Sequence, residues 1–359
     1  MKRLLYALTS VLLFAGVFTS CEKPNSTNEG SGTEKMGIIK GMVTDKEIGL
    51  PLSGVILELQ PTGKQAQTTA DGIYILDSLK TDIYTIKATK KGYNEYVSDE
   101  IRLSVGKTIT LDIELEDEPF EPKEPELRKD YTETAFGMDL EMVYVQGGAF
   151  LMGATVEQGD DAEEDEKPVR RVKLDGYHIG KYEVTQAQWK AVMGSYYYSK
   201  GDDYPVYRMS RYAAQEFCKK LSEQTGKKYV LPTEAQWEYA ARGGNKSQHY
   251  KYAGSNDVDE VAWYMANSGD TIHPVGTKKA NELGLYDMSG NVGEWCSDLY
   301  GNYDENDTEN PQGPIEGEWV YRGGSFFASP AGSCRVSSRG YLGGPDMLRY
   351  GFRVACISE

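Results

Sequence analysis

Two stretches of the sequence decide the fold: residues 231–244 read LPTEAQWEYAARGG, and residues 281–295 read NELGLYDMSGNVGEW. In the first stretch Thr233 is followed three residues later by Gln236. This is a capping box, in which each side chain bonds the backbone N–H of the other residue at the start of a helix. Gly243 follows the last apolar turn and is typical of a helix end. The stretch therefore predicts a short helix that begins after Thr233.

Two further helices are expected before this stretch. The segment TQAQWKAVMG begins with the same capping box at Thr185 and ends at Gly194. A second helix is expected over residues 210–225, with Gly226 as its stop signal. Beyond Gly244 no helical period continues, so we expect only loops and short strands there.

Four more phrases surround these segments. They are GGAFLMG at 147–153, YEVTQAQW at 182–189, YRGGSF at 321–326 and YGFRVA at 350–355. Taken in order, these phrases and the two stretches above resemble the family of the formylglycine-generating enzyme, or sulfatase-modifying factor, over residues 136–359. The resemblance implies an α+β fold: a C-type-lectin-like domain with little regular secondary structure and with bound calcium.

The resemblance also implies a structural calcium site within residues 281–295. Calcium prefers carboxylate and carbonyl oxygens that converge on a turn, and two carboxylates stand seven residues apart across a Gly-rich turn here. Carried over position by position, the site takes side-chain oxygens from Asp287 and Glu294 and carbonyl oxygens from Met288, Gly290 and Val292. The alternative is that both carboxylates only cap backbone N–H groups. A second calcium site of the family, near Asn267, is not expected because its remaining ligand segment is shortened.

The same resemblance raises the question of catalysis. Family members that make formylglycine oxidise a substrate cysteine with a copper ion held by two thiolates, which soft Cu(I) prefers. Those thiols stand third and eighth after the Gly-Gly-Ser motif, and these positions are Ala328 and Ser333 here. Cys334 lies one residue further, where a slip along an extended segment turns its side chain to the opposite face. We therefore expect no copper and no catalysis, with a formylglycine-generating oxidase as the alternative.

Four cysteines follow the N-terminal region, namely Cys218, Cys296, Cys334 and Cys356. Disulfides form and persist in exported proteins, and four cysteines allow three pairings among which the sequence does not choose. By comparison with the family that the sequence resembles, Cys296 is a candidate disulfide partner of Cys334. Cys218 is likewise a candidate disulfide partner of Cys356. We expect structural cystines rather than a redox pair.

The C-terminal segment alternates framework phrases with two irregular stretches, residues 326–333 and 340–350. This arrangement resembles the C-terminal variable regions of lectin-like proteins that retroelements diversify. The residues expected on such a ligand-binding face are Phe327, Ala328, Ser329, Ser333, Tyr341, Leu342 and Leu348. Tyrosine and phenylalanine offer rigid contact area at low entropic cost. The alternative is an inactive family member whose loops have drifted.

The first twenty residues predict a bacterial lipoprotein signal peptide. A positive start precedes an apolar run over residues 4–18, and the ending F-T-S-C resembles a lipobox. Cys21 is then the lipidated first residue of the mature chain, and residues 21–36 form a polar tether. We expect a cell-envelope protein anchored to the membrane, at the outer membrane or the cell surface. The alternative is an ordinary cleaved secretory signal.

Residues 37–116 consist of short alternating runs, such as GVILELQ and KTITLDIELE, that are typical of an antiparallel β-sandwich. The phrases GMVTD, PLSGVILEL and TTADGIYIL resemble the carboxypeptidase regulatory-like domain, which implies an all-β, transthyretin-like spacer. Residues 117–135 are expected to be an extended acidic linker. The acidic run at 157–166 is expected to be a solvated loop rather than a cation site.

The charge of the chain limits its partners. Thirty-nine Lys and Arg against 55 Asp and Glu give a net charge of −16, which repels nucleic-acid phosphates. The three histidines lack the spacing of a zinc hydrolase. We therefore expect a lipid-anchored, calcium-stabilised protein that binds a protein or surface ligand and no nucleic acid. The alternative is a structural component of an envelope complex.

Overall fold

The computed structural model describes residues 35–342 and 347–357. They form two compact units: one reaches Lys90 and includes Asn94–Glu116, and the other contains Lys91–Tyr93 and the chain from Asp117 onward. The expected signal peptide, the lipid-anchor residue Cys21 and most of the tether lie outside the described residues. No helix in the described ranges is long and apolar enough to cross a membrane.

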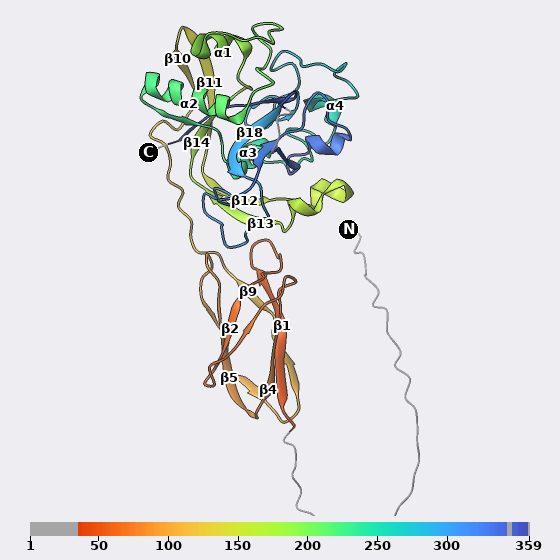
Figure 1. Ribbon diagram of the computed structural model, residues 1–359. Coiled ribbons are helices and arrows are strands. Elements are labelled where there is room, and N and C mark those ends of the chain that lie inside the picture. Colours follow the sequence, from red (N-terminus) through yellow and green to blue (C-terminus); the bar gives the residue numbers. More distant parts are fainter. Residues whose placement is uncertain (1–34, 343–346, 358–359) are drawn as a thin grey trace, which may run out of the picture. The chain divides into compact units, whose positions relative to one another are not determined.

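The N-terminal unit is a β-sandwich of two sheets (Figure 1). One sheet contains β4 (Ile73–Leu79), β1 (Gly37–Asp45), β8 (Thr108–Thr110) and β9 (Ile113–Leu115). The other contains β3 (Lys64–Gln67), β2 (Ile56–Gln60), β5 (Asp82–Thr89), β6 (Tyr96–Val97) and β7 (Ile101–Leu103). In β5 the alternate residues Tyr84, Ile86 and Ala88 are buried, as a two-sheet core requires.

The all-β prediction is confirmed, but the sandwich is not purely antiparallel. β1 pairs in parallel with β8 and with β9. The chain reaches β8 from β7, which belongs to the other sheet, and therefore enters beside β1 in the same direction. Local alternation predicts strands but carries no information about such a change of sheet.

The C-terminal unit is built on two larger sheets and two strand pairs. The main sheet has the order β10 (Tyr131–Ala135), β11 (Met138–Val145), β14 (Tyr177–Gly180), β22 (Ala355–Ile357) and β15 (Lys228–Val230). The second has the order β20 (Arg339–Leu342), β19 (Trp319–Arg322), β18 (Gly293–Leu299) and β21 (Tyr350–Gly351). β12 (Gly148–Met152) pairs with β13 (Arg170–Leu174), and β16 (Ala262–Trp263) with β17 (Ser289–Gly290). β22, the last strand within the described ranges, thus lies inside the main sheet.

The three predicted helices are confirmed. They are α1 (Gln186–Met193), α2 (Arg211–Thr225) and α3 (Glu234–Ala241). In each helix the backbone amide of the third residue donates to the side chain of the capping residue, which is Thr185, Ser210 or Thr233. Both predicted capping boxes form. Gly226 ends α2 in the left-handed conformation that glycine adopts without steric cost. α1 packs against α2 and β11 (Figure 1), and α3 contributes the buried Trp237 to the core around β12, β13 and β18.

The region after Gly244 contains more helix than expected. A single turn, α4 (Val258–Val261), begins where the Asp257 side chain accepts a bond from the Asp259 amide. Four short 3-10 helices also form in this unit: η1 (Val156–Asp161), η2 (Glu164–Glu166), η3 (Gly244–Lys246) and η4 (Ala331–Cys334). Such single turns are too short to produce a periodic sequence signal.

The acidic segment expected as an extended linker packs against the C-terminal unit. Asp117 lies 2.6 Å from the Arg171 guanidinium. Glu124 accepts a bond of 2.7 Å from the Tyr144 hydroxyl and one of 2.9 Å from the Gly147 amide. Strand β10 then occupies residues 131–135, which the linker prediction had included. Local charge indicated solvation, whereas partners in the C-terminal unit hold Asp117 and Glu124.

Candidate functional site

The turn that carries the predicted calcium ligands has an unusual backbone. Asp287, Gly290 and Asn291 all have positive φ, at 58°, 84° and 55°. Left-handed conformations are uncommon for residues other than glycine. A Cβ on Gly290 would lie 2.4 Å from the Trp263 carbonyl oxygen, so only glycine fits there. The turn between Asp287 and Glu294 is therefore strained, tight and buried.

Glu294 and Arg353 form a buried ion pair behind this turn. The Arg353 guanidinium donates to both carboxylate oxygens, at 2.7 Å from Nε and 2.6 Å from Nη2. The Trp237 indole N–H also donates to Glu294, at 2.8 Å. Both charged side chains are fully buried. Bidentate pairs of this kind fix the orientation of a carboxylate.

Two more carboxylates, those of Asp287 and Glu183, lie close enough to Arg353 to interact with its positive charge. Asp287 accepts a bond of 2.7 Å from the Gly276 amide through Oδ2, while its buried Oδ1 has no partner. Burial raises the pKa of Asp287 to about 6. Glu183 accepts bonds from the Asn291 side chain and the Val292 amide. Burial and the neighbouring carboxylates Asp287 and Glu294 raise the pKa of Glu183 well above its usual value.

The turn offers one free oxygen atom to a cation. Three buried carboxylates share one guanidinium, and burial raises the pKa of Asp287 and Glu183, so that their neutral forms are favoured where no further positive charge is present. Both oxygens of Glu294 already accept bonds from Arg353. The orphaned Oδ1 of Asp287 offers a free ligand atom. In the described ranges no three His, Cys, Asp or Glu side chains come together as a metal-binding group. A cation here therefore needs backbone carbonyl oxygens as well, which is the mixed donor set that calcium accepts.

Glu183 and Arg353 were not identified as site residues from the sequence. Both lie in phrases that carry the family resemblance, YEVTQAQW and YGFRVA. A charged residue placed between an aromatic residue and a valine, as in Y-E-V and F-R-V, is the signal that could have found them. Asn267, by contrast, uses its side chain locally, in bonds to Asp259 and to the Ala262 carbonyl.

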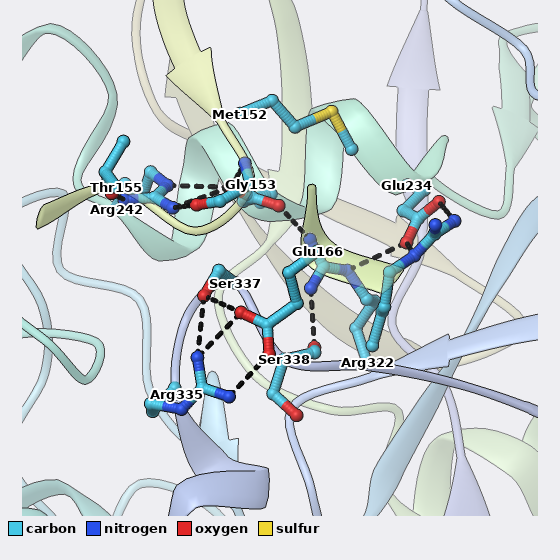
Figure 2. A network of polar contacts seen from close by, with 12 residues as sticks. Met152, Gly153, Thr155, Glu166, Glu234, Arg242, Arg322, Arg335, Ser337 and Ser338 are labelled. Atoms are coloured by element: carbon cyan, nitrogen blue, oxygen red, sulfur yellow. Dashed lines mark hydrogen bonds and ion pairs between the residues drawn. The ribbon is translucent and has the colours of Figure 1, made fainter. Parts of the chain in front are cut away.

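A network of buried ion pairs supports the segment beside the turn. Arg322 bonds to Glu238 and lies 3.4 Å from Glu234. Glu234 also forms a bidentate pair with Arg339, at 2.8 and 2.6 Å. Arg242 bonds to Glu238 at 2.8 Å and to the Gly153 carbonyl at 2.6 Å, as Figure 2 shows for its contact with Gly153. The network joins α3 to the strands β19 and β20.

The acidic run at 157–166 belongs to this network, which corrects the prediction of a solvated loop. Glu166 is fully buried and accepts bonds of 2.5 to 2.7 Å from Arg335, with a further bond from Ser337 (Figure 2). Glu157 lies 2.7 Å from Arg242. Arg335 lowers the pKa of Glu166 against the effect of burial, which acts to raise it. Two of the seven carboxylates are thus structural anions.

A cavity of 260 Å³ lies beside these ion pairs. Four of the seven predicted ligand-binding residues line it, namely Phe327, Ala328, Ser329 and Ser333. Its other lining residues include Tyr321, Arg322, Ser325, Arg339, Arg349 and Tyr350. Ala328 is only 8% exposed and packs in a small apolar cluster, so it forms the floor of the cavity rather than a contact surface.

The other three predicted residues do not line the cavity. Tyr341 is exposed on β20 and stacks on Tyr300, with ring centroids 4.3 Å apart. Leu342 is half-buried and packs with the cluster that contains Trp319. Leu348 is 51% exposed. Of the seven residues predicted to form one binding face, four therefore line the cavity and three lie outside it.

Comparison with known proteins identifies the unit that carries the turn and the cavity. Residues 129–357 match the sulfatase-modifying factor enzyme 1-like domain. The chain belongs to this sulfatase-modifying factor family. Residues 38–116 match the carboxypeptidase regulatory-like domain, in agreement with the sandwich.

Three similar proteins show the range of the likeness. The chaperone protein LppX of Paenibacillus barcinonensis is 34% identical, over 60% of this chain and 88% of that protein. The formylglycine-generating enzyme of Streptomyces coelicolor is 28% identical, over 55% and 82%. Among solved structures, the variable protein 1 of Treponema denticola is 30% identical, with a TM-score of 0.56, over 63% of this chain and 98% of that chain.

Ala328 and Ser333, the two positions at which the resemblance implies copper-binding thiols, both line this cavity. Cys334 is fully buried and lies in the apolar cluster with Ala328. Burial raises the pKa of the Cys334 thiol to about 12, which keeps it protonated. Among the described residues, the thiol adjacent to these two positions is therefore buried and does not line the cavity.

The disulfide predictions are wrong in this structure. Cys218, Cys296, Cys334 and Cys356 are all free thiols. Cys296 lies in the core cluster of Trp237, whereas Cys334 packs with Tyr252 in another cluster. Cys218, on the buried face of α2, and Cys356, on β22, pack against the same core cluster but remain free thiols. The four thiols serve as small hydrophobic residues.

Asp298 gives the unit a testable pH dependence. Burial, together with the Glu234 carboxylate, raises the pKa of Asp298 to about 7. Because the folded state then holds this proton more tightly than the unfolded chain, whose aspartates titrate near ~4, the associated stability is present below ~pH 4 and is lost as the pH rises through about 7. We expect Asp298→Asn to flatten the fall in unfolding free energy over this range in urea titrations at fixed calcium. Parallel curves for the two proteins would contradict the assignment.

Proposed function

We propose that the chain is a lipid-anchored envelope protein whose C-terminal unit binds a ligand and does not catalyse cysteine oxidation. The observation that carries the proposal is the cavity, in which Ala328 and Ser333 stand where two copper-binding thiols are expected. Cys334 lies at the next position but is fully buried among apolar side chains. The cavity therefore offers a surface for recognition and no site for Cu(I).

Calcium has a structural part in this proposal. The ion is held by Asp287 and Glu294, with the carbonyl oxygens of Met288, Gly290 and Val292. It neutralises the carboxylates that Arg353 alone leaves uncompensated and fixes a turn from which β18 begins. The orphaned Oδ1 of Asp287 supports this role. Calcium thereby stabilises the sheet beside the cavity and makes no contact with the ligand.

The location follows from the N-terminal sequence. The lipobox-like ending F-T-S-C supports lipidation of Cys21 and attachment to a membrane of the bacterial envelope. The sandwich then serves as a spacer without chemistry of its own. The likeness to a protein named variable protein 1 supports ligand-binding loops that differ between related chains. Retroelement diversification of residues 326–350 is the corresponding genetic proposal.

One experiment separates recognition from oxidation. The full chain, extracted in detergent, is loaded with Cu(I) and incubated with a cysteine-containing peptide in air, while thiol loss and oxygen consumption are followed. We expect neither above the rate of free copper. Copper-dependent oxidation that Cys334→Ser abolishes would overturn the proposal and assign the oxidase function. Related strains provide the second measurement: differences spread evenly over the chain, and not concentrated in 326–350, would overturn the proposal of diversified loops.

A further inference from the structure

A continuous array of aromatic rings lies beside the cavity. Tyr197 contacts Tyr198, with ring centroids 5.0 Å apart, and Tyr198 contacts Tyr207 at 6.5 Å. Tyr207 contacts Phe326 at 6.5 Å, and Phe326 contacts Phe327, a cavity residue, at 6.3 Å. We call these five residues the aromatic ladder.

The aromatic ladder joins two distant parts of the sequence, with exposed rings at one end and Tyr207, which is 8% exposed and packs in a core cluster with Ile272 and Val292, at its centre. Three of its rings come from residues 197–207, which no prediction from the sequence had assigned to a binding face. Tyr197 is 91% exposed and Tyr198 is 42% exposed, so neither serves the core. Large exposed rings that contact one another mark interaction surfaces more often than isolated exposed residues do. The ladder therefore extends the cavity outward onto a second loop.

Two arginines accompany the ladder. The Arg208 guanidinium lies over the rings of Tyr198 and Tyr207, at 4.7 and 5.4 Å, and that of Arg349 lies over Phe327 at 4.3 Å. Neither arginine forms an ion pair with a carboxylate of the described ranges. Arg208 also has a positive φ of 58°, a conformation that costs energy for a residue with a side chain. Aromatic contacts hold both cations in place while their charge remains available.

The geometry of the rings indicates the class of partner. Successive rings of the ladder are inclined by 61° to 89°, so they form edges and crevices and no flat platform on which sugar rings could lie. Crevices between edge-to-face rings accept apolar side chains. Because neither guanidinium has an ion-pair partner within the described ranges, both can bind carboxylates of the partner. Tyrosine, phenylalanine and arginine together are the composition of protein-binding hot spots.

We propose that the aromatic ladder, with Arg208 and Arg349, docks a protein segment in which Asp or Glu side chains flank apolar residues. The proposal rests on the ligand-binding function above and names its partner class. The apolar side chains enter the crevices of the ladder, and the carboxylates pair with the two guanidiniums. The acidic character of the chain as a whole, −16, makes a local cationic surface selective for such a segment.

Selection from a displayed library of short random peptides tests the partner class. The probe is the full chain in detergent, immobilised at low ionic strength. We expect enriched peptides with carboxylates beside apolar residues, whose binding weakens as salt rises. Arg208→Ala and Arg349→Ala are each expected to weaken the best peptide about tenfold or more, since a hydrogen bond to a charged group is lost. Tyr198→Ala is expected to have an effect of similar size.

The matched control is Tyr212→Ala, which removes another exposed tyrosine, 67% exposed, that contacts Trp319 and not the ladder. It should leave peptide affinity unchanged. Enrichment of neutral or basic peptides, or no enrichment, would overturn the proposal. Affinity that falls in Tyr341→Ser and Leu348→Ser but not in Tyr198→Ala or Arg208→Ala would also overturn it and leave the ligand-binding function standing. Equal urea midpoints show that the variants are folded.

Discussion

Replacing Arg322 by methionine is expected to destabilise the C-terminal unit by about 3–5 kcal/mol, because the change leaves buried carboxylates without their cation. Arg322 is 1% exposed and pairs with Glu238 and Glu234, which lie on α3. It also donates to the Ser338 carbonyl at 2.5 Å (Figure 2). Urea unfolding followed by tryptophan fluorescence measures the effect, since Trp237 packs beside the guanidinium.

The control for Arg322 is an ion pair at the surface. Lys219 lies 4.0 Å from Glu223 on α2, and both side chains are 65% exposed. Lys219→Met should change the unfolding free energy by less than about 1 kcal/mol. Adding Glu238→Gln to Arg322→Met should recover part of the loss, because one of the unpaired charges is removed. An Arg322→Met protein as stable as the Lys219→Met protein would contradict a structural role for the network.

Removal of calcium is expected to lower the melting temperature of the C-terminal unit by about 10 °C. A ligand present at a thousand times its dissociation constant stabilises the folded state by about 4 kcal/mol, and in a unit of this size each kcal/mol corresponds to about 2–4 °C. The physical reason is that Glu183, Asp287 and Glu294 then share Arg353 alone. Differential scanning calorimetry with calcium and with a chelator measures the shift.

Two substitutions distinguish calcium binding from general loss of charge. Asp287→Ala removes a ligand and should abolish the difference between the calcium and chelator scans. Asp298→Asn removes another buried carboxylate, outside the turn, and should retain that difference. Identical melting temperatures for the unaltered protein with and without calcium would sink the calcium proposal. They would leave the docking surface untouched, because no residue of the aromatic ladder is a proposed ligand.

Local signals predicted local structure well. The capping boxes at Thr185 and Thr233 placed α1 and α3, because a cap is a contact between residues three apart and is fully written in the sequence. Alternating runs predicted the strands of the sandwich for the same reason. The family phrases predicted the lectin-like fold of the C-terminal unit, which neither periodicity nor composition indicates.

Charge in the sequence was a poor guide to solvation. Glu166 lies in a run of acidic residues and looks exposed, yet it pairs with Arg335, 169 positions later. Glu124 in the expected linker is likewise held by Tyr144 and Gly147. Whether a carboxylate is solvated or buried depends on a partner that only the tertiary fold supplies. The same holds for Cys296 and Cys334, which the fold places in separate apolar clusters.

The binding face was predicted only in part. The irregular stretch at 326–333 pointed to Phe327 and Ser333, which do line the cavity. Tyr197, Tyr198 and Arg208 were missed, since nothing in a tyrosine-rich loop shows which distant loop it will contact. The unpaired guanidinium of Arg208 and its positive φ become informative only once the rings around it are placed.

The position of β22 makes the main sheet depend on three residues. β22 joins β14 to β15 in the interior of that sheet. Without residues 355–357, β14 and β15 would each lose a neighbour and present unpaired backbone groups. Such open strand edges pair with other chains. A disturbance of this short strand is therefore expected to promote aggregation of the unit that carries the recognition loops.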